Sequence, residues 1–276
     1  MKLSFEFFPP KTDAGLLHLL EAAEQFKSFN PEYFSVTFGA GGSTQTFTLN
    51  AVASLQQKGF EVSPHLSCIG ATQTNIAALL MQYKNQGISR LVALRGDLPS
   101  GSGSLMGDFH HGRDLVAFIR ETTGQHFKIA VGAYPECHPQ AVNLTQDLDY
   151  FKAKVDAGAD VAITQYFYNA DAYFHLLEEC ARRQITIPII PGIMPIYNFS
   201  QLSRFSEMCG AEIPRYMRKT MEGLGDDVNA IQDFGVEVVS RLCATLLKAG
   251  VSGLHFYTLN KYSIIEKILK EIPLCH

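Results

Sequence analysis

A single carboxylate, Glu6, lies within an apolar run near the start of the chain. Residues Leu3 to Lys11 read L-S-F-E-F-F-P-P-K, which predicts a buried β-strand stopped by two prolines. A charged carboxylate in such a strand is costly to desolvate unless it is paired or lies at a cleft, and burial tends to raise its pKa. A raised pKa suits a group that delivers a proton near neutral pH, so Glu6 is a candidate general acid.

Polar side chains also lie at the ends of most of the other predicted strands. One such residue alone is usually a capping or loop hydrogen bond, whereas polar groups at seven of eight strand ends indicate a shared site. In α/β barrels, the carboxyl ends of the strands and the loops after them build the active site. The residues concerned are Thr37, His65, Ser67, Arg95, Asp97, Tyr134, Glu136, His138, Gln165, Tyr257, Thr258 and Asn260.

The elements that must position these residues alternate along the chain. Apolar, β-branched or aromatic runs predict eight strands, at Lys2–Phe8, Tyr33–Phe38, Val62–Cys68, Arg90–Arg95, Lys128–Tyr134, Val161–Tyr166, Ile187–Pro191 and Gly253–Thr258. Amphipathic stretches predict helices at Asp13–Ser28, Thr44–Lys58, Thr72–Gln86, Gly112–Thr122, Leu144–Ala157, Asp171–Arg183 and Lys261–Ile272, with Ser43 and Thr72 as N-caps.

Strands that alternate with helices imply parallel pairing through right-handed crossovers. Eight such units predict a (β/α)8 barrel, the TIM-barrel fold, with residues 1–276 as one catalytic domain. The long segment Asn198–Lys248, before the eighth strand, predicts an extended helical region of two or three helices.

Strand alternation predicts which way Glu6 points. Ser4, Glu6 and Phe8 share one face of the first strand, and Leu3, Phe5 and Phe7 share the other. The wholly apolar face should meet the surrounding helices, so Glu6 is expected to point into the barrel.

Other motifs are less specific. The glycine-rich turn Phe38–Ser43 lacks the G-x-G-x-x-G spacing, so a phosphate contact and a plain tight turn are about equally supported. The histidines lack metal-site spacing, and no metal is expected. The six cysteines show neither C-x-x-C nor zinc-type spacing, which favours reduced thiols.

Composition excludes several classes of protein. Hydrophobic residues make up 46% of the chain and charged residues 18%, which fits a large globular core, and the net charge of −4 argues against a nucleic-acid partner. No signal peptide and no apolar run of membrane-spanning length is apparent. We therefore expect a soluble, cytoplasmic protein with no membrane or nucleic-acid partner.

Eight motifs in order resemble those of the methylenetetrahydrofolate reductases of the bacterial, single-domain type. The N-terminal half contains F-E-F-F-P-P-K at Phe5–Lys11, V-T-F-G-A-G-G at Val36–Gly42, P-H-L-S-C-I at Pro64–Ile69 and A-L-R-G-D-L-P at Ala93–Pro99. The remainder contains A-Y-P-E-C-H-P at Ala133–Pro139, D-A-G-A-D-V-A-I-T-Q at Asp156–Gln165, I-I-P-G-I-M-P at Ile189–Pro195 and H-F-Y-T-L-N at His255–Asn260. The resemblance covers nearly the whole chain.

The resemblance implies an FAD-dependent oxidoreductase of one-carbon metabolism and methionine biosynthesis. NADH or NADPH would reduce the flavin and leave, and 5,10-methylenetetrahydrofolate would then be reduced to 5-methyltetrahydrofolate in the same place, by a ping-pong scheme. Glu6 matches the family's general acid. Asp97 matches an aspartate that tunes the charge near flavin and pterin, and a negative charge there would favour a cationic iminium.

The resemblance also assigns binding residues. The implied FAD contacts are Thr37, His65, Leu94, Arg95, Gly96, Asp97, His111, Gly112, Tyr134, His138, Ala141, Asp147, Tyr150 and Lys154. The implied folate or nicotinamide contacts are Asp97, Gln165, Gln201, Phe205, Tyr257 and Lys261. Relatives are often dimers or tetramers, so a homo-oligomer is expected.

The chain departs from the family pattern in four respects. His111 replaces a tyrosine that often meets the cofactor, the loop Ser100–His110 is longer than expected, Tyr150 and Ala153 replace polar and basic contacts, and Lys261 replaces an arginine. Lysine keeps the charge but lacks the two-pronged carboxylate grip of arginine.

Two alternatives stay open at this point. One is an FAD-dependent barrel like proline dehydrogenase, although no paired arginines form a carboxylate clamp. The other is a non-catalytic flavin- or folate-binding subunit, against which the presence of both Glu6 and Asp97 argues. No acidic residue of a Rossmann motif distinguishes NADH from NADPH.

Overall fold

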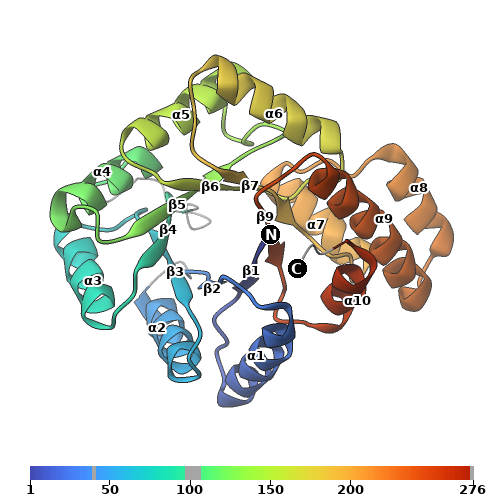
Figure 1. Cartoon of the computed structure of the whole chain (residues 1–276), viewed down its shortest axis with the longest axis horizontal. Coiled ribbons are helices and arrows are strands. Elements are labelled where there is room, and N and C mark those ends of the chain that lie inside the picture. The colour runs from blue at the N-terminus through green and yellow to red at the C-terminus, as the bar shows by residue number, and fades with distance from the viewer. Residues whose placement is uncertain (39–41, 97–106, 274–276) are drawn as a thin grey trace.

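Parallel strands form a barrel with helices around it (Figure 1). The computed structural model describes residues 1–38, 42–96 and 107–273. Within them, the sheet order is β7-β6-β5-β4-β3-β2-β1-β9-β8, and every pair of neighbours is parallel. The strands are β1 (Lys2–Phe7), β2 (Tyr33–Val36), β3 (Val62–Ser67), β4 (Arg90–Leu94), β5 (Lys128–Ala133), β6 (Val161–Thr164), β7 (Ile189–Ile190), β8 (Gly192–Ile193) and β9 (Gly253–Tyr257).

The seventh predicted strand differs from the expectation of Ile187–Pro191. It starts later, continues to Ile193 and is divided at Pro191 into β7, which pairs with β6, and β8, which pairs with β9. Proline has no N–H to give to a ladder, which explains the break. Because β7 and β8 are two halves of one segment, their separate pairings close the barrel.

The predicted helices are confirmed, with ends shifted by at most two residues. Their bounds are α1 (Asp13–Phe26), the 3-10 helix η1 (Lys27–Phe29), α2 (Gly42–Gln57), α3 (Gln73–Asn85), α4 (Gly112–Thr123), α5 (Leu144–Asp156), α6 (Ala170–Arg182), α7 (Phe199–Cys209), α8 (Arg215–Leu224), α9 (Val228–Lys248) and α10 (Ser263–Glu271). The extended segment before the last strand thus contains three helices, α7 to α9.

One of the two predicted N-caps is confirmed. The Thr72 hydroxyl accepts a hydrogen bond from the backbone N–H of Asn75, as an N-cap does. Ser43 was wrongly predicted as a cap: α2 begins one residue earlier, at Gly42, so the backbone of Ser43 is already helical.

Most strands end one or two residues before the predicted limit. At these ends hydrogen bonding continues on one side only, as in the bonds from Thr37 N to Phe7 O (2.9 Å) and from Gln165 N to Ala133 O (2.8 Å). An apolar run therefore extends beyond the regular two-sided ladder, and its last residues are free to leave the sheet at the mouth of the barrel.

The predicted alternation along β1 is confirmed. Phe5 is fully buried between barrel and helices, where its ring stacks on Phe26 of α1 with centroids 4.2 Å apart. Phe7 and Phe34 extend the same aromatic layer, with ring centroids 5.3 Å apart. Each buried phenylalanine contributes roughly 2–3 kcal/mol of transfer free energy. Glu6, on the opposite face, points into the barrel.

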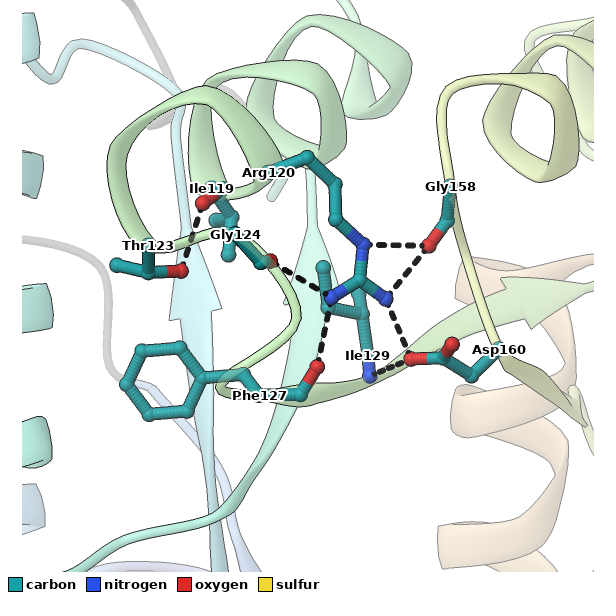
Figure 2. Close-up of polar contacts among 8 residues, drawn as sticks. All are labelled: Ile119, Arg120, Thr123, Gly124, Phe127, Ile129, Gly158 and Asp160. Carbon is teal, nitrogen blue, oxygen red and sulfur yellow. Dashed lines mark hydrogen bonds and ion pairs between the residues drawn. The ribbon is translucent and has the colours of Figure 1, made fainter.

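A largely buried arginine joins the loop before β5 to the loop before β6 (Figure 2). Arg120, in the last turn of α4, donates to the carbonyl oxygens of Phe127 (2.8 Å) and Gly158 (2.7 Å). It also pairs with Asp160 at 2.6 Å, and that carboxylate accepts a further bond from the backbone N–H of Ile129. The cluster fixes the starts of two neighbouring strands.

Arg120→Ala should lower the free energy of unfolding by about 2–4 kcal/mol, because it removes the charged donor from the carbonyl groups of Phe127 and Gly158 and the ion pair with Asp160. Urea unfolding followed by circular dichroism measures this. Arg241→Ala, which removes an exposed pair with Glu237 on α9, is the matched control and should change stability by less than about 0.5 kcal/mol. Equal effects of the two substitutions would contradict the structural role of Arg120.

Candidate active site at the mouth of the barrel

Two buried histidines approach the carboxylate of Glu6. Glu6 is 8% exposed, and its Oε2 lies 3.4 Å from Nε2 of His65 on β3 and 3.5 Å from Nε2 of His255 on β9. Neither Nε2 atom has another hydrogen-bond partner among the described residues. The expected inward direction of Glu6 therefore brings it to an otherwise unused pair of imidazole nitrogens.

The two imidazoles differ in their surroundings. Burial lowers the pKa of His65 to about 4, against the opposing charge of Glu6, so this ring is neutral at physiological pH. His255 is fully buried, and its Nδ1 lies 2.8 Å from the hydroxyl of Ser4. The carboxyl group of Glu6 thus faces one neutral ring and one ring whose tautomer depends on a serine hydroxyl.

A cavity of about 340 Å³ lies at the same end of the barrel, between the ends of β4 and β5 and the helices α4 and α5. Its lining combines cationic, aromatic and backbone groups, and it includes most of the residues for which a cofactor contact is predicted. These are Leu94, Arg95, Gly96, His111, Gly112, Tyr134, His138, Ala141, Asp147, Tyr150 and Lys154.

A lysine and an aspartate are held together in the wall of this cavity. Lys154 on α5 donates to the carbonyl oxygen of Gly132 at 2.5 Å, and burial lowers its pKa to about 8, against the opposing charge of Asp147. Asp147 accepts from the backbone N–H of His138 at 2.9 Å, and burial raises its pKa. A phosphate that entered the cavity would add negative charge beside Lys154 and stabilise its charged form.

Gly96 marks a close approach at the end of β4. Its φ is +85°, and a Cβ there would lie 2.0 Å from the hydroxyl oxygen of Ser67. That hydroxyl donates to the carbonyl of Arg95 at 3.0 Å, so the turn is held tightly against β3. Only glycine fits both the backbone conformation and the space.

The rim offers groups suited to a phosphate and to a flat ring. α4 begins at Gly112 on the cavity wall, and the N-terminus of a helix favours anions. Arg95 donates to the side-chain oxygen of Gln140. The rings of His111 and Tyr150 stack on each other, with centroids 5.7 Å apart. His111 and Tyr150, two of the residues that depart from the family pattern, thus form one aromatic pair.

Two described residues of the predicted cofactor set lie elsewhere. His65 is inside the barrel with Glu6, and Thr37, at the end of β2, does not line the cavity. Asp97, also predicted as catalytic, lies outside the described residues, as do residues 100–106 of the long loop and Gly39 and Gly41 of the glycine-rich turn.

Sequence reasoning missed four lining residues. Two are the small strand residues Ala93 and Gly132, which expose backbone and carry no chemical signal. Gln140 follows His138 by two residues and could have been found from that spacing. Arg113 lies in the first turn of α4, where the helix prediction placed it but no motif singled it out.

The predicted substrate residues follow β6, β8 and β9. Tyr257 donates its hydroxyl to the carbonyl of Thr164 at 2.7 Å, next to Gln165. Gln201 lies in the first turn of α7, and Phe205 is one turn further along and partly buried. The ammonium of Lys261 lies 4.5 Å from the ring centroid of Tyr197. These residues lie at the same end of the barrel as Glu6, and Gln165 follows β6, the strand next to β5.

The lowered pKa of Lys154 predicts a specific dependence of stability on pH. Between pH 8 and the ordinary value of 10.5, the unfolded chain binds more protons at this lysine than the folded protein, so stability rises with pH through this window. In urea unfolding of protein stripped of bound ligand, Lys154→Met should remove part of this rise. Lys152→Met, which removes an exposed lysine of the same helix, should keep it; an identical pH profile for both variants would contradict the assignment.

Comparison with known proteins identifies the chain's relatives. The model of the family described as methylenetetrahydrofolate reductase matches residues 1–273. The "5,10-methylenetetrahydrofolate reductase" of Escherichia coli is 38% identical over 262 residues, which cover 95% of this chain and 87% of that protein. The "Probable methylenetetrahydrofolate reductase (NADH)" of Oryza sativa is 38% identical over 98% of this chain and 48% of its own length.

Solved structures support the same architecture. A Clostridium thermocellum protein described as uncharacterized, which "binds two copies of 5-methyl-5,6,7,8-tetrahydrofolic acid", superposes with a TM-score of 0.69 at 15% identity, covering 98% of this chain and 93% of that one. At this identity the likeness shows the fold alone, an α/β barrel. No helix of the described residues is long and apolar enough to cross a membrane. Because the family model matches residues 1–273 of this 276-residue chain, the chain belongs to the methylenetetrahydrofolate reductase family.

Proposed function

We propose that this enzyme reduces 5,10-methylenetetrahydrofolate to 5-methyltetrahydrofolate with NADH or NADPH. The observation that carries the proposal is the place of Glu6, a carboxyl group inside the barrel between two buried histidines, at the same end of the barrel as a cavity lined by cationic groups and a helix N-terminus. Family membership favours this reaction over a proline dehydrogenase-like activity or a non-catalytic subunit. The protein would act in the cytoplasm, in one-carbon metabolism and methionine biosynthesis. It would form one catalytic domain and assemble as a homo-oligomer, without a membrane or nucleic-acid partner.

FAD is the proposed cofactor, and the cavity residues fit it. The N-terminus of α4 at Gly112, together with Arg95 and Lys154, would hold the diphosphate, because these groups concentrate positive charge and N–H donors. The stacked His111 and Tyr150 present ring faces for the adenosine end. When bound, FAD supplies a hydride acceptor for the nicotinamide and a hydride donor for the folate, which alternate in one site in the ping-pong scheme.

Glu6 is the proposed general acid. The five-membered ring of the folate must open to an iminium before it can accept hydride, and opening requires a proton on the leaving nitrogen. Glu6, with its carboxyl oxygen between His65 and His255, is held where a substrate at the mouth would meet it. Asp97 is proposed to stabilise the cationic iminium through its negative charge.

The substrate contacts proposed from the sequence are consistent with their placement. Gln165 and Tyr257 are tied together through Thr164 at the end of β6. Phe205 offers a ring for stacking against either planar substrate. Lys261, whose ammonium lies against the ring of Tyr197, would provide a single cationic contact to a folate carboxylate.

Glu6→Gln keeps the shape of the side chain but removes its acid. In anaerobic stopped-flow measurements it should leave reduction of the flavin by nicotinamide within a few-fold of wild type and slow oxidation by the folate roughly 10²–10⁴-fold. Glu61→Gln, on the surface before β3, is the control and should leave both half-reactions unchanged. Normal folate turnover in Glu6→Gln would eliminate the proposed role.

The cofactor itself can be tested directly. Purified protein should be yellow, and anaerobic NADH or NADPH should bleach it. Gly96→Ala should weaken FAD binding at least about tenfold, because the added Cβ collides with Ser67 beside the cavity. Gly59→Ala is the control for strain at positive φ, because an added Cβ there meets no other atom, and it should leave FAD binding unchanged. Colourless protein that takes up no added FAD would contradict the flavin assignment.

A further inference from the structure

A second cavity, of about 160 Å³, opens at the opposite end of the barrel. Its walls are formed where the strands begin, by residues that include Lys2, Ser4, Tyr33, Ser63, Arg90 and Lys128. Several of these are charged: Glu32 pairs with Lys2 at 3.0 Å and with Arg90 at 2.9 Å, and the Arg90 guanidinium lies 5.2 Å from the ring centroid of Tyr33. Apolar residues such as Leu91, Ala130 and Ile190 complete the wall, and the charged groups offer hydrogen-bond partners to water that enters the cavity.

Two side chains connect this cavity with Glu6. Ser4 lies on the cavity wall, and its hydroxyl is 2.8 Å from Nδ1 of His255. The other ring nitrogen of His255, Nε2, lies 3.5 Å from Oε2 of Glu6. The register of the sheet makes this possible, because Ser4 of β1 is paired with His255 of β9, and Glu6 is one inward-facing position further along.

The surroundings of His255 hold its ring between Ser4 and Glu6. The ring is fully buried, between Tyr33 at 6.3 Å and Tyr257 at 5.4 Å between ring centroids. His65, the other imidazole at Glu6, is held neutral by burial, with its pKa at about 4. Among the described contacts, His255 is therefore the group that links Glu6 to a polar atom at the far cavity.

Each reduction of the folate removes one proton from the general acid, which must be replaced before the next turnover. At the mouth, Glu6 is 8% exposed even without ligands, and bound flavin and substrate would cover it further. A supply of protons from the opposite face would not require the mouth to be empty.

We propose that Glu6 is reprotonated through the barrel interior, from water in the N-terminal cavity by way of Ser4 and His255. The Ser4 hydroxyl gives its proton to His255 Nδ1 and takes one from cavity water, while His255 Nε2 gives its proton to Glu6. In the sum, solvent loses one proton and the carboxylate gains one. Reorientation of the imidazole between turnovers restores its starting tautomer. This inference rests on the proposed role of Glu6 as the acid.

The test compares the first turnover with continuous turnover in the FAD-loaded enzyme. The first turnover uses the proton that the proposed acid carries before folate is added, so in Ser4→Ala a single oxidation of reduced flavin by 5,10-methylenetetrahydrofolate should proceed within twofold of wild type. Steady-state kcat should fall at least about tenfold, since each later turnover waits for a proton. Ser4→Thr, which keeps a hydroxyl, should restore kcat.

Ser63→Ala is the matched control, since Ser63 lines the same cavity from β3 and lies outside the path, and its kcat should be unchanged. A second readout is His255→Ala, in which added imidazole should raise steady-state kcat more than the single-turnover rate. Unchanged kcat in Ser4→Ala, or an equal fall in both rates, would overturn the relay. Neither result would affect the role of Glu6, because that role fails only if Glu6→Gln still reduces the folate in a single turnover.

Discussion

The alternation of side chains along β1 is the constraint on which the rest of the structure depends. Successive residues of a strand point to opposite faces, so the phenylalanines that bind the barrel to α1 necessarily turn the residues between them inward. Phe5 and Phe7 bury their rings against the helical layer, and Glu6 is thereby held inside the barrel. Burial of Phe5 and Phe7 on the opposite face offsets the desolvation free energy of the Glu6 carboxyl group.

The two ends of the barrel differ in what they expose. At the mouth, strands end in polar residues, and a cavity between β4, β5, α4 and α5 gathers a helix N-terminus, three cationic side chains and an aromatic pair. At the base, charged residues surround a smaller cavity. A column of inward-facing polar side chains, Ser4, His255 and Glu6, runs between them on two neighbouring strands. Barrel interiors are ordinarily filled with branched apolar residues, as Val92, Ala130 and Ile163 fill the other side here.

Much of this was predictable because it depends on local periodicity. The strands and helices, the inward direction of Glu6 and the N-cap at Thr72 follow from patterns of apolar and capping residues a few positions apart. The errors arise where local periodicity does not decide the outcome. The seventh strand is divided at Pro191, and α2 starts before Ser43. Both features depend on which neighbouring segment supplies each hydrogen bond, and the residue pattern along a single segment does not contain that information.

By itself, the sequence determined the order of the elements, the barrel, the candidate acid and, through ordered motifs, the family. Only the tertiary structure decided that His65 belongs with Glu6 rather than with the cavity, that His111 and Tyr150 stack on each other, and that Ser4 connects His255 with the opposite end of the barrel. The reason is separation along the chain. Ser4 and His255 are 251 residues apart, and only the closure of the sheet, which pairs the first strand with the last, brings their side chains within hydrogen-bond distance.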